Sequence, residues 1–156
     1  MTSIGGGTQW AAPRSLPTGH LPPARPAGSV ARRVLLADPC GDTVESTAWL
    51  LRLWGHDVRG VGSGHEALEV ARAYRPDTML MEIALPGLDG CEVARRVRHQ
   101  ATGPEVLLVA LTGYGDQKHR RRSLEAGFDY HLVKPVEPEA LQSLLAMDHQ
   151  EAGGKK

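Results

Sequence analysis

Aromatic residues and cysteines are both scarce in this chain. Only 4% of its 156 residues are Phe, Trp or Tyr, so it has no aromatics interleaved with basic residues of the kind that stack on nucleic-acid bases. The two cysteines, Cys40 and Cys91, form no CxxC pair and no Cys/His cluster. A disulfide framework and a zinc site therefore lack support, and reduced cytosolic thiols are expected.

The chain also lacks a net charge and a long hydrophobic run. Lys and Arg number 18 and so do Asp and Glu, so no overall field favours nucleic acid or an anionic membrane. No apolar run approaches the roughly 20 residues of a membrane-spanning helix. The first residues have neither the basic nor the apolar region of a signal peptide. The sequence therefore predicts a cytoplasmic protein with no membrane partner.

Proline is abundant only near the N-terminus, where glycine and alanine accompany it. Residues 1–31 have almost no periodic apolar pattern, and such a segment cannot bury enough surface to offset the entropy of ordering it. We predict a disordered arm over 1–31, one folded domain over 32–148 and a flexible tail over 149–156. The arm contains arginines and no acid. We interpret it as a solvated extension, with binding of nucleic acid or an acidic partner as the alternative.

Short apolar runs alternate with helical patterns through the rest of the chain. The runs at 34–37, 79–81, 106–111 and 130–133 suit buried strands, and the more polar 57–61 suits an edge strand. Helical periodicity follows each of them, which predicts five strands, five helices and a doubly wound parallel sheet.

Helix boundaries and histidine positions can also be predicted locally. Asp42, with Glu45 three residues on, is the expected N-cap of the first helix, and Ser63 and Asp89 are expected to cap the second and third. Four other histidines show no metal-ligand spacing and are expected on the surface: His56, His65, His99 and His119.

Four strands end in polar or charged residues. Asp38 follows the first strand and Glu82 the third, while Thr112 ends the fourth and Lys134 follows the fifth. Function in such sheets gathers at the carboxyl ends of the strands. Two carboxylates, a hydroxyl and an ammonium at one edge suit an anion or phosphoryl group held beside a cation.

The motifs at these strand ends resemble those of a known family. Leu-Leu-Ala-Asp, Met-Glu-Ile-x-Leu-Pro-Gly-x-Asp-Gly, Ala-Leu-Thr-Gly-Tyr-Gly and Leu-Val-Lys-Pro-Val, in this order, are similar to the receiver domain of two-component response regulators. The resemblance implies a flavodoxin-like five-stranded sheet of order 2-1-3-4-5 and a phospho-accepting Asp at the end of strand three. It also implies an acidic pair after strand one that holds magnesium. A Thr and a Lys contact the phosphoryl group, the bond between Lys134 and Pro135 is cis, and an aromatic switch lies near His131.

Two positions depart from the family pattern. Glu82 stands where the family has its phospho-accepting Asp, and Pro39 stands where it has the second acid of the pair. Asp38 and Glu82, with the carbonyl of Ala84, still offer oxygens to magnesium, but the site is weak and no cofactor is expected. Phosphoryl transfer depends on close positioning, so we predict that phosphorylation is lost or very slow.

The extra methylene of Glu82 carries its carboxylate toward the place of a phosphoryl group, between Thr112 and Lys134. One hypothesis is that Glu82 partly mimics phosphorylation and holds an active-like state; the other is that Glu82 and Lys134 only neutralise each other. His131 is expected to be a packed, hydrogen-bonded residue and not a pH switch.

The sequence thus predicts an atypical stand-alone receiver, not an enzyme, that binds a histidine kinase or a downstream target. A homodimer through the last two helices is a further expectation. The basic run Lys118–Arg122 is interpreted as a solvated helix face that can also set the charge seen by a partner. Two alternatives stay open: a working receiver that accepts phosphate on Glu82, and a nucleic-acid binder that uses the basic arm, which we rank last.

Overall fold

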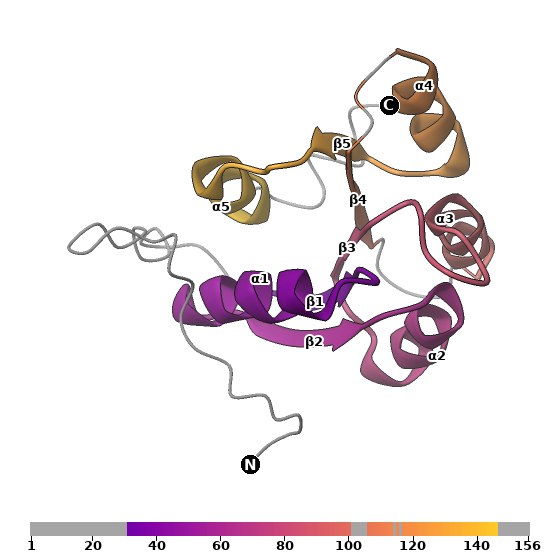
Figure 1. The fold of residues 1–156 in the computed structure, drawn as a ribbon. Helices are drawn as coiled ribbons and strands as arrows, with labels where there is room; N and C mark the ends of the chain where they lie inside the picture. The colour runs from indigo at the N-terminus through magenta and orange to yellow at the C-terminus, as the bar shows by residue number, and fades with distance from the viewer. Residues whose placement is uncertain (1–30, 101–105, 114, 116, 147–156) are drawn as a thin grey trace.

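The computed structural model describes residues 31–100, 106–113, 115 and 117–146. All of the predicted tail, and all of the predicted arm except residue 31, lie outside these residues. The described part alternates strands and helices along the chain (Figure 1). The elements are β1 (Arg33–Ala37), α1 (Gly41–Leu53), β2 (Asp57–Val61), α2 (Gly64–Tyr74), β3 (Thr78–Met81), α3 (Gly90–His99), β4 (Leu107–Thr112), α4 (Gln117–Ala126), β5 (Tyr130–Val133) and α5 (Pro138–Ala146).

The strands form one parallel sheet of order β2-β1-β3-β4-β5, as predicted. Every residue of β3 and β4 is buried, because both faces of the central strands are covered by helices. β2 lies at the edge of the sheet, and only one of its five residues is buried, in agreement with its polar sequence.

Helices cover both faces of the sheet, with α1 and α5 on one side and α2, α3 and α4 on the other (Figure 1). Leu36, Leu80 and Val109 point toward α1 and α5, where Leu51 and Leu144 pack. The side chains between them along each strand point the other way, because the side-chain period of a strand is two. Burying one such apolar side chain contributes about 1.5–3 kcal/mol.

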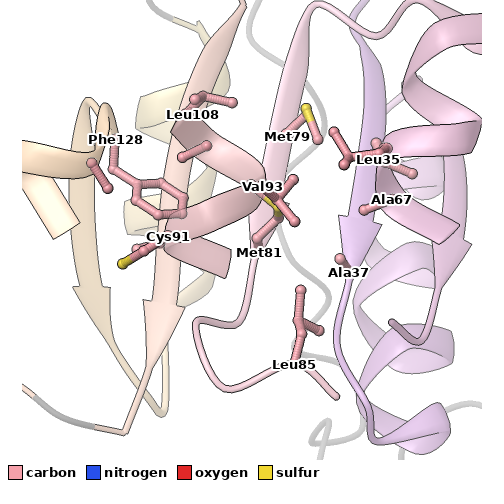
Figure 2. Close-up of a cluster of buried hydrophobic side chains, with 14 residues drawn as sticks. Leu35, Ala37, Ala67, Met79, Met81, Leu85, Cys91, Val93, Leu108 and Phe128 are labelled. Atoms are coloured by element: carbon pink, nitrogen blue, oxygen red, sulfur yellow. The ribbon is translucent and has the colours of Figure 1, made fainter. Parts of the chain in front are cut away.

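The second core lies under α2, α3 and α4 (Figure 2). Met79 and Met81 of β3 meet Val93 of α3 and Leu108 of β4 there, and Phe128 closes the cluster beside α4. The one phenylalanine of the chain is thus buried in the core.

Two of the three predicted helix caps are confirmed. Ser63 accepts a hydrogen bond from the backbone N–H of Glu66, and Asp89 accepts one from the N–H of Glu92. The prediction for Asp42 is wrong: α1 begins two residues earlier, with Cys40 as its N-cap, so Asp42 lies in the first turn. An acid there still interacts favourably with the helix dipole.

The expectation that His56 lies on the surface is also wrong. Its side chain is buried, and its Nδ1 accepts the backbone N–H of Arg32 at 2.9 Å, just before β1 begins. The backbone N–H of His56 in turn bonds to the carbonyl of Leu51. Burial of this polar ring is tolerated because its Nδ1 is paired with the backbone N–H of Arg32.

Two loops at the carboxyl edge of the sheet approach closely. A Cβ on Gly64 would lie 1.9 Å from the carbonyl oxygen of Leu88, and one on Gly90 would lie 2.7 Å from that of Glu82. Glycine is therefore required where α2 and α3 begin, and the loop that follows Glu82 is held against both helices. Among the described residues, no helix combines the length and apolar character needed to cross a membrane.

Candidate functional site

The candidate site begins where β1 and β3 end. These strands pair in parallel with Ala37 opposite Met81, and the N–H of Glu82 donates to the carbonyl of Ala37 at 2.9 Å. Asp38 and Glu82 are the next residues on each strand, and both are buried. The register alone therefore places two carboxylates side by side at the carboxyl edge of the sheet.

Lys134 reaches the same place from β5. Val133 pairs with Thr112 at the end of β4, and the N–H of Lys134 donates to the carbonyl of Thr112 at 2.8 Å. The Lys134–Pro135 bond is cis, as the family resemblance implied. The Nζ of Lys134 lies 2.6 Å from Oδ2 of Asp38 and 2.9 Å from Oε1 of Glu82, so one ammonium bridges both carboxylates. We call Asp38, Glu82 and Lys134 the strand-end cluster.

The other oxygen of each carboxylate in the cluster is bonded to the backbone. Oδ1 of Asp38 accepts the N–H of Cys40 at 2.9 Å, and Oε2 of Glu82 accepts the N–H of Ala84 at 3.0 Å. Each carboxylate is thus held by the shared ammonium of Lys134 and by one backbone amide, and both contacts are charge-assisted hydrogen bonds. Neither backbone contact was predicted from the sequence. For Asp38 the signal exists, because an Asp side chain commonly accepts the backbone N–H two residues further on and so forms a turn.

The charge of Lys134 is maintained by its two partners. Desolvation at this edge lowers the pKa of Lys134, but the hydrogen bonds and charges of Asp38 and Glu82 outweigh it, so the pKa is raised above its usual 10.5. The lysine is cationic throughout the physiological range. The cluster accordingly carries two negative charges and one positive charge.

Thr112 and His131 complete the residues predicted from the sequence. Thr112 is buried at the end of β4, where its carbonyl anchors Lys134. His131 is buried in β5, and its Nδ1 lies 2.8 Å from Oγ of Ser123 on α4. Ser123 Oγ also donates to the carbonyl of Arg120 at 2.9 Å. The prediction of a packed, hydrogen-bonded histidine is confirmed, and the bond ties β5 to α4.

Comparisons with known proteins identify the family of this chain. A sequence profile described as the response regulator receiver domain matches residues 34–146, which is most of the chain. The chain belongs to the response regulator receiver family.

Two mycobacterial response regulators are among the curated relatives of this receiver. It is 34% identical over 110 residues to the DNA-binding response regulator MtrA of Mycobacterium tuberculosis strain H37Rv, an alignment that covers 70% of this chain and 47% of MtrA. It is 36% identical over 114 residues to the response regulator MprA of Mycobacterium leprae, covering 73% of this chain and 48% of MprA. The receiver thus spans about half the length of these relatives.

Solved structures confirm the fold. The receiver domain of the sensor histidine kinase PA1611 from Pseudomonas aeruginosa, solved with magnesium coordinated in its active-site cleft, is 31% identical with a TM-score of 0.69; the match covers 80% of this chain and 99% of that one. The BeF3-activated receiver domain of Klebsiella pneumoniae RstA is 29% identical with a TM-score of 0.67, covering 72% and 94%. A CheY-like receiver from Methanospirillum hungatei, at 24% identity and a TM-score of 0.71, supports the fold alone, with coverage of 81% and 100%.

The donor set of this receiver does not fit magnesium. The ion takes about six oxygens at 2.0–2.1 Å, usually anchored by carboxylates. Here the ammonium of Lys134 lies between Asp38 and Glu82, and both remaining carboxylate oxygens accept backbone N–H groups. Pro39 offers no side-chain oxygen. In the described part of the chain, no three His, Cys, Asp or Glu side chains are grouped so that they could hold a metal ion.

The two cysteine thiols differ in environment. Cys40 is exposed at the start of α1, where the hydroxyl and the N–H of Thr43 lower the pKa of its thiol. Cys91 is buried at the start of α3, and burial raises the pKa of its thiol. Both are free.

Proposed function

We propose that this chain is an atypical receiver that binds a protein partner with little or no phosphorylation and has no enzymatic activity of its own. The partner is a histidine kinase or a downstream signalling target. The observation that carries the proposal is the bridge from Lys134 to both Asp38 and Glu82. In this arrangement the cation that would contact a phosphoryl group already has two anionic partners.

Three features of the site disfavour phosphoryl transfer. Glu82 is one methylene longer than the family's phospho-accepting Asp, and both of its carboxylate oxygens are hydrogen-bonded. Pro39 stands where the family has the second acid of its magnesium-holding pair. Because the reaction depends on in-line geometry and on neutralising the developing charge, these changes act together against it.

Glu82 can also bias the receiver toward one state without phosphate. A full charge about 3 Å from the ammonium is worth on the order of 5 kcal/mol at a partly screened dielectric, before desolvation is counted. That is enough to shift an equilibrium whose states differ by a few kcal/mol. Phosphorylation would bring about −1.5 to −2 charges whereas Glu82 brings one, and Asp38 shares the same ammonium, so the mimic is partial. The competing interpretation is simple neutralisation with no switching.

The chemical part of the proposal is tested with a small phosphodonor and magnesium. Intact-mass measurement should show no acyl phosphate on the wild-type chain. The double variant Pro39→Asp with Glu82→Asp should acquire one, which serves as the positive control. Efficient labelling of wild-type Glu82 would overturn the proposal in favour of a working phosphoacceptor.

The mimic is tested on the chain itself by amide NMR spectra. BeF3, which activates the Klebsiella receiver, is added with magnesium to the double variant to define the active-like spectrum. Wild type should lie near that spectrum without additions, while Glu82→Ala should move away from it. If wild type and Glu82→Ala give the same spectrum outside the site, Glu82 only neutralises Lys134.

A nucleic-acid role is the second candidate, because the curated relative MtrA is named as a DNA-binding response regulator. The basic helix α4 supplies cations for it, but α4 has no Phe, Trp or Tyr among them. The deciding observation is salt-sensitive retardation of DNA or RNA that disappears when residues 1–31 are deleted. We place this role behind protein binding.

A further inference from the structure

Helix α1 carries one of the few exposed large hydrophobic side chains of the described residues. Leu53, in its last turn, is 50% exposed. Trp49 lies four residues earlier and is half-buried, so helical spacing places the two side chains next to each other. They lie on the side of α1 away from the sheet, opposite the buried Leu51. The second half of α1 therefore presents apolar surface that the core does not cover.

The first half of the same side is acidic. Asp42 and Glu45 are both exposed, and Asp42 lies seven residues before Trp49, which is two turns along the same face. No Lys or Arg of the described residues lies within ion-pair distance of either carboxylate. The helix dipole favours acids in the first turn, but it does not account for the apolar half. We call Asp42, Glu45, Trp49 and Leu53 the outer face of α1.

The other two exposed large hydrophobic side chains have the opposite surroundings. Leu124 follows Arg120 and Arg121 by one helical turn, and Val133 directly precedes Lys134. Of these three places in the described part, the outer face of α1 is the one that joins apolar surface to negative charge without a paired cation. A ligand that fits it is both apolar and cationic.

Residues 1–31 have this composition. They contain two arginines and no Asp or Glu. Residues 22–26 read Pro-Pro-Ala-Arg-Pro, so Arg25 stands among three prolines. Proline-rich segments favour the extended polyproline conformation and pack on exposed aromatic side chains with little loss of entropy. The segment that precedes the domain thus offers prolines for Trp49 and a cation for the acids.

The start of β1 brings this segment to α1. The N–H of Arg32 donates to Nδ1 of His56, three residues after α1 ends, so the chain enters β1 beside the C-terminal end of α1. In the polyproline conformation the nine residues 22–30 span about 28 Å, at about 3.1 Å each. The 13 residues of α1 span about 20 Å. Residues 22–30 are therefore long enough to run back along the whole helix.

We propose that residues 22–30 pack along the outer face of α1 and restrict the access of other molecules to it. The prolines cover Trp49 and Leu53, and the guanidinium of Arg25 pairs with the carboxylate of Glu45. Because segment and face belong to one chain, the effective concentration is about millimolar, and a contact too weak to form between separate molecules is populated. The inference does not depend on phosphorylation or on any role of Glu82.

The outer face of α1 fits this occupant better than two others. In an antiparallel pair of α1 helices from two copies, the acids of one copy would need Arg52 of the other. The guanidinium of Arg52 already donates to the carbonyl of Val58 at 2.8 Å. Residues 147–156 have two acids against two lysines, and they contain no proline or aromatic residue.

The direct test is paramagnetic broadening of backbone amide NMR signals in the full chain. A nitroxide is attached at Ala24→Cys in a Cys40→Ser background, because Cys40 is exposed whereas Cys91 is buried. The amides of α1 should broaden more than those of α2 and α4. The broadening should decline at about 1 M salt, where charges are screened beyond about 3 Å.

Matched variants locate the contact. Arg25→Glu should lower the ratio of docked to undocked segment by more than about two- to fivefold, the range for losing one exposed ion pair, because it also adds repulsion. Arg14→Glu makes the same charge change outside residues 22–30 and should leave the broadening nearly unchanged. Glu45→Arg combined with Arg25→Glu should restore the contact. Leu53→Ser should weaken it without removing its salt dependence.

Three results would overturn the inference. These are equal broadening of α1, α2 and α4, equal effects of Arg25→Glu and Arg14→Glu, or failure of Glu45→Arg to rescue Arg25→Glu. A mixture of isotope-labelled chain and spin-labelled chain should show no broadening, and broadening there would assign the face to a second copy instead. The phosphodonor test of the proposed function does not involve this contact, so the two proposals can fail separately.

Discussion

Lys134→Met is the most informative single perturbation of the strand-end cluster. The substitution keeps the length of the side chain but removes the ammonium, 2.6 Å from Asp38 and 2.9 Å from Glu82. Hydrogen bonds to charged groups contribute about 1.5–3 kcal/mol each. Because the lysine side chain is 31% exposed, water partly replaces these bonds. We therefore expect the free energy of unfolding to fall by about 2–4 kcal/mol at neutral pH.

The loss should come mainly from the two carboxylates left without a cation. Two carboxylates that share one ammonium repel each other by about 3 kcal/mol at a partly screened dielectric once that ammonium is removed. Adding Glu82→Gln to Lys134→Met should therefore restore part of the stability, whereas Glu82→Gln in the wild-type background should destabilise. Lys134→Arg keeps the charge and is the control.

The assay is urea denaturation followed by circular dichroism, with the four proteins of the cycle measured side by side. If Lys134→Met lowers the free energy of unfolding by less than about 1 kcal/mol, the cluster behaves as an ordinary exposed ion pair. Additivity of the two substitutions would also refute the reasoning, because it would show that residues 82 and 134 do not interact.

Further predictions concern alkaline pH and packing. The contribution of Lys134 should be present below pH 10.5 and lost as the pH rises through its raised folded pKa. Burial and a neighbouring carboxylate raise the pKa of Tyr74 from 10.0 to about 12, so stability should also fall between these pH values, and less so in Tyr74→Phe, as pH-dependent thermal melts can show. Arg98 donates four hydrogen bonds, and Arg98→Ala should cost about 2–3 kcal/mol in urea denaturation; a loss within 0.5 kcal/mol, about that of a surface substitution, would contradict this. Gly64→Ala should destabilise by about 2 kcal/mol or more, because its Cβ would lie 1.9 Å from a backbone oxygen, whereas Gly41→Ala meets nothing within 4 Å and should be neutral or stabilising in the same assay.

The sequence predicted the members of the strand-end cluster because the topology leaves little freedom. Apolar runs of strand length fixed which residues come last, and parallel strands bring their carboxyl ends to one edge. Asp38, Glu82 and Lys134 therefore had to lie near one another. Their pairing was not predictable in detail, since the sharing of one ammonium depends on rotamers and on the course of the loop after β5.

The start of α1 shows why a local motif can mislead. Asp42 and Glu45 fit the pattern of a capping box, but Asp38 accepts the N–H of Cys40 and forms a turn across Pro39. The first helical bond then runs from the N–H of Val44 to the carbonyl of Cys40, and the helix begins before Asp42. A residue of the site thus decides where the helix starts, and propensity within the helix cannot reveal this.

His56 was misplaced for a different reason. Its neighbours Gly55 and Asp57 are exposed, and local polarity therefore indicated the surface. The buried ring of His56 accepts a hydrogen bond from the backbone N–H of Arg32, which lies 24 positions away in the sequence. A backbone donor leaves no signature in a sequence pattern, so only the packing of α1 against the start of β1 shows the contact.

The charge balance of the site predicts that position 39 decides metal binding. Asp38, Glu82 and Lys134 together carry one net negative charge, and the backbone amides of Cys40 and Ala84 stabilise the two carboxylates. An acid at position 39 would add a second negative charge that Lys134 cannot neutralise, and a divalent cation then becomes favourable. Glu82→Asp alone adds no charge. We therefore expect Pro39→Asp to raise magnesium affinity more than Glu82→Asp in calorimetric titrations, and the reverse order would show that carboxylate length, not charge, excludes the ion.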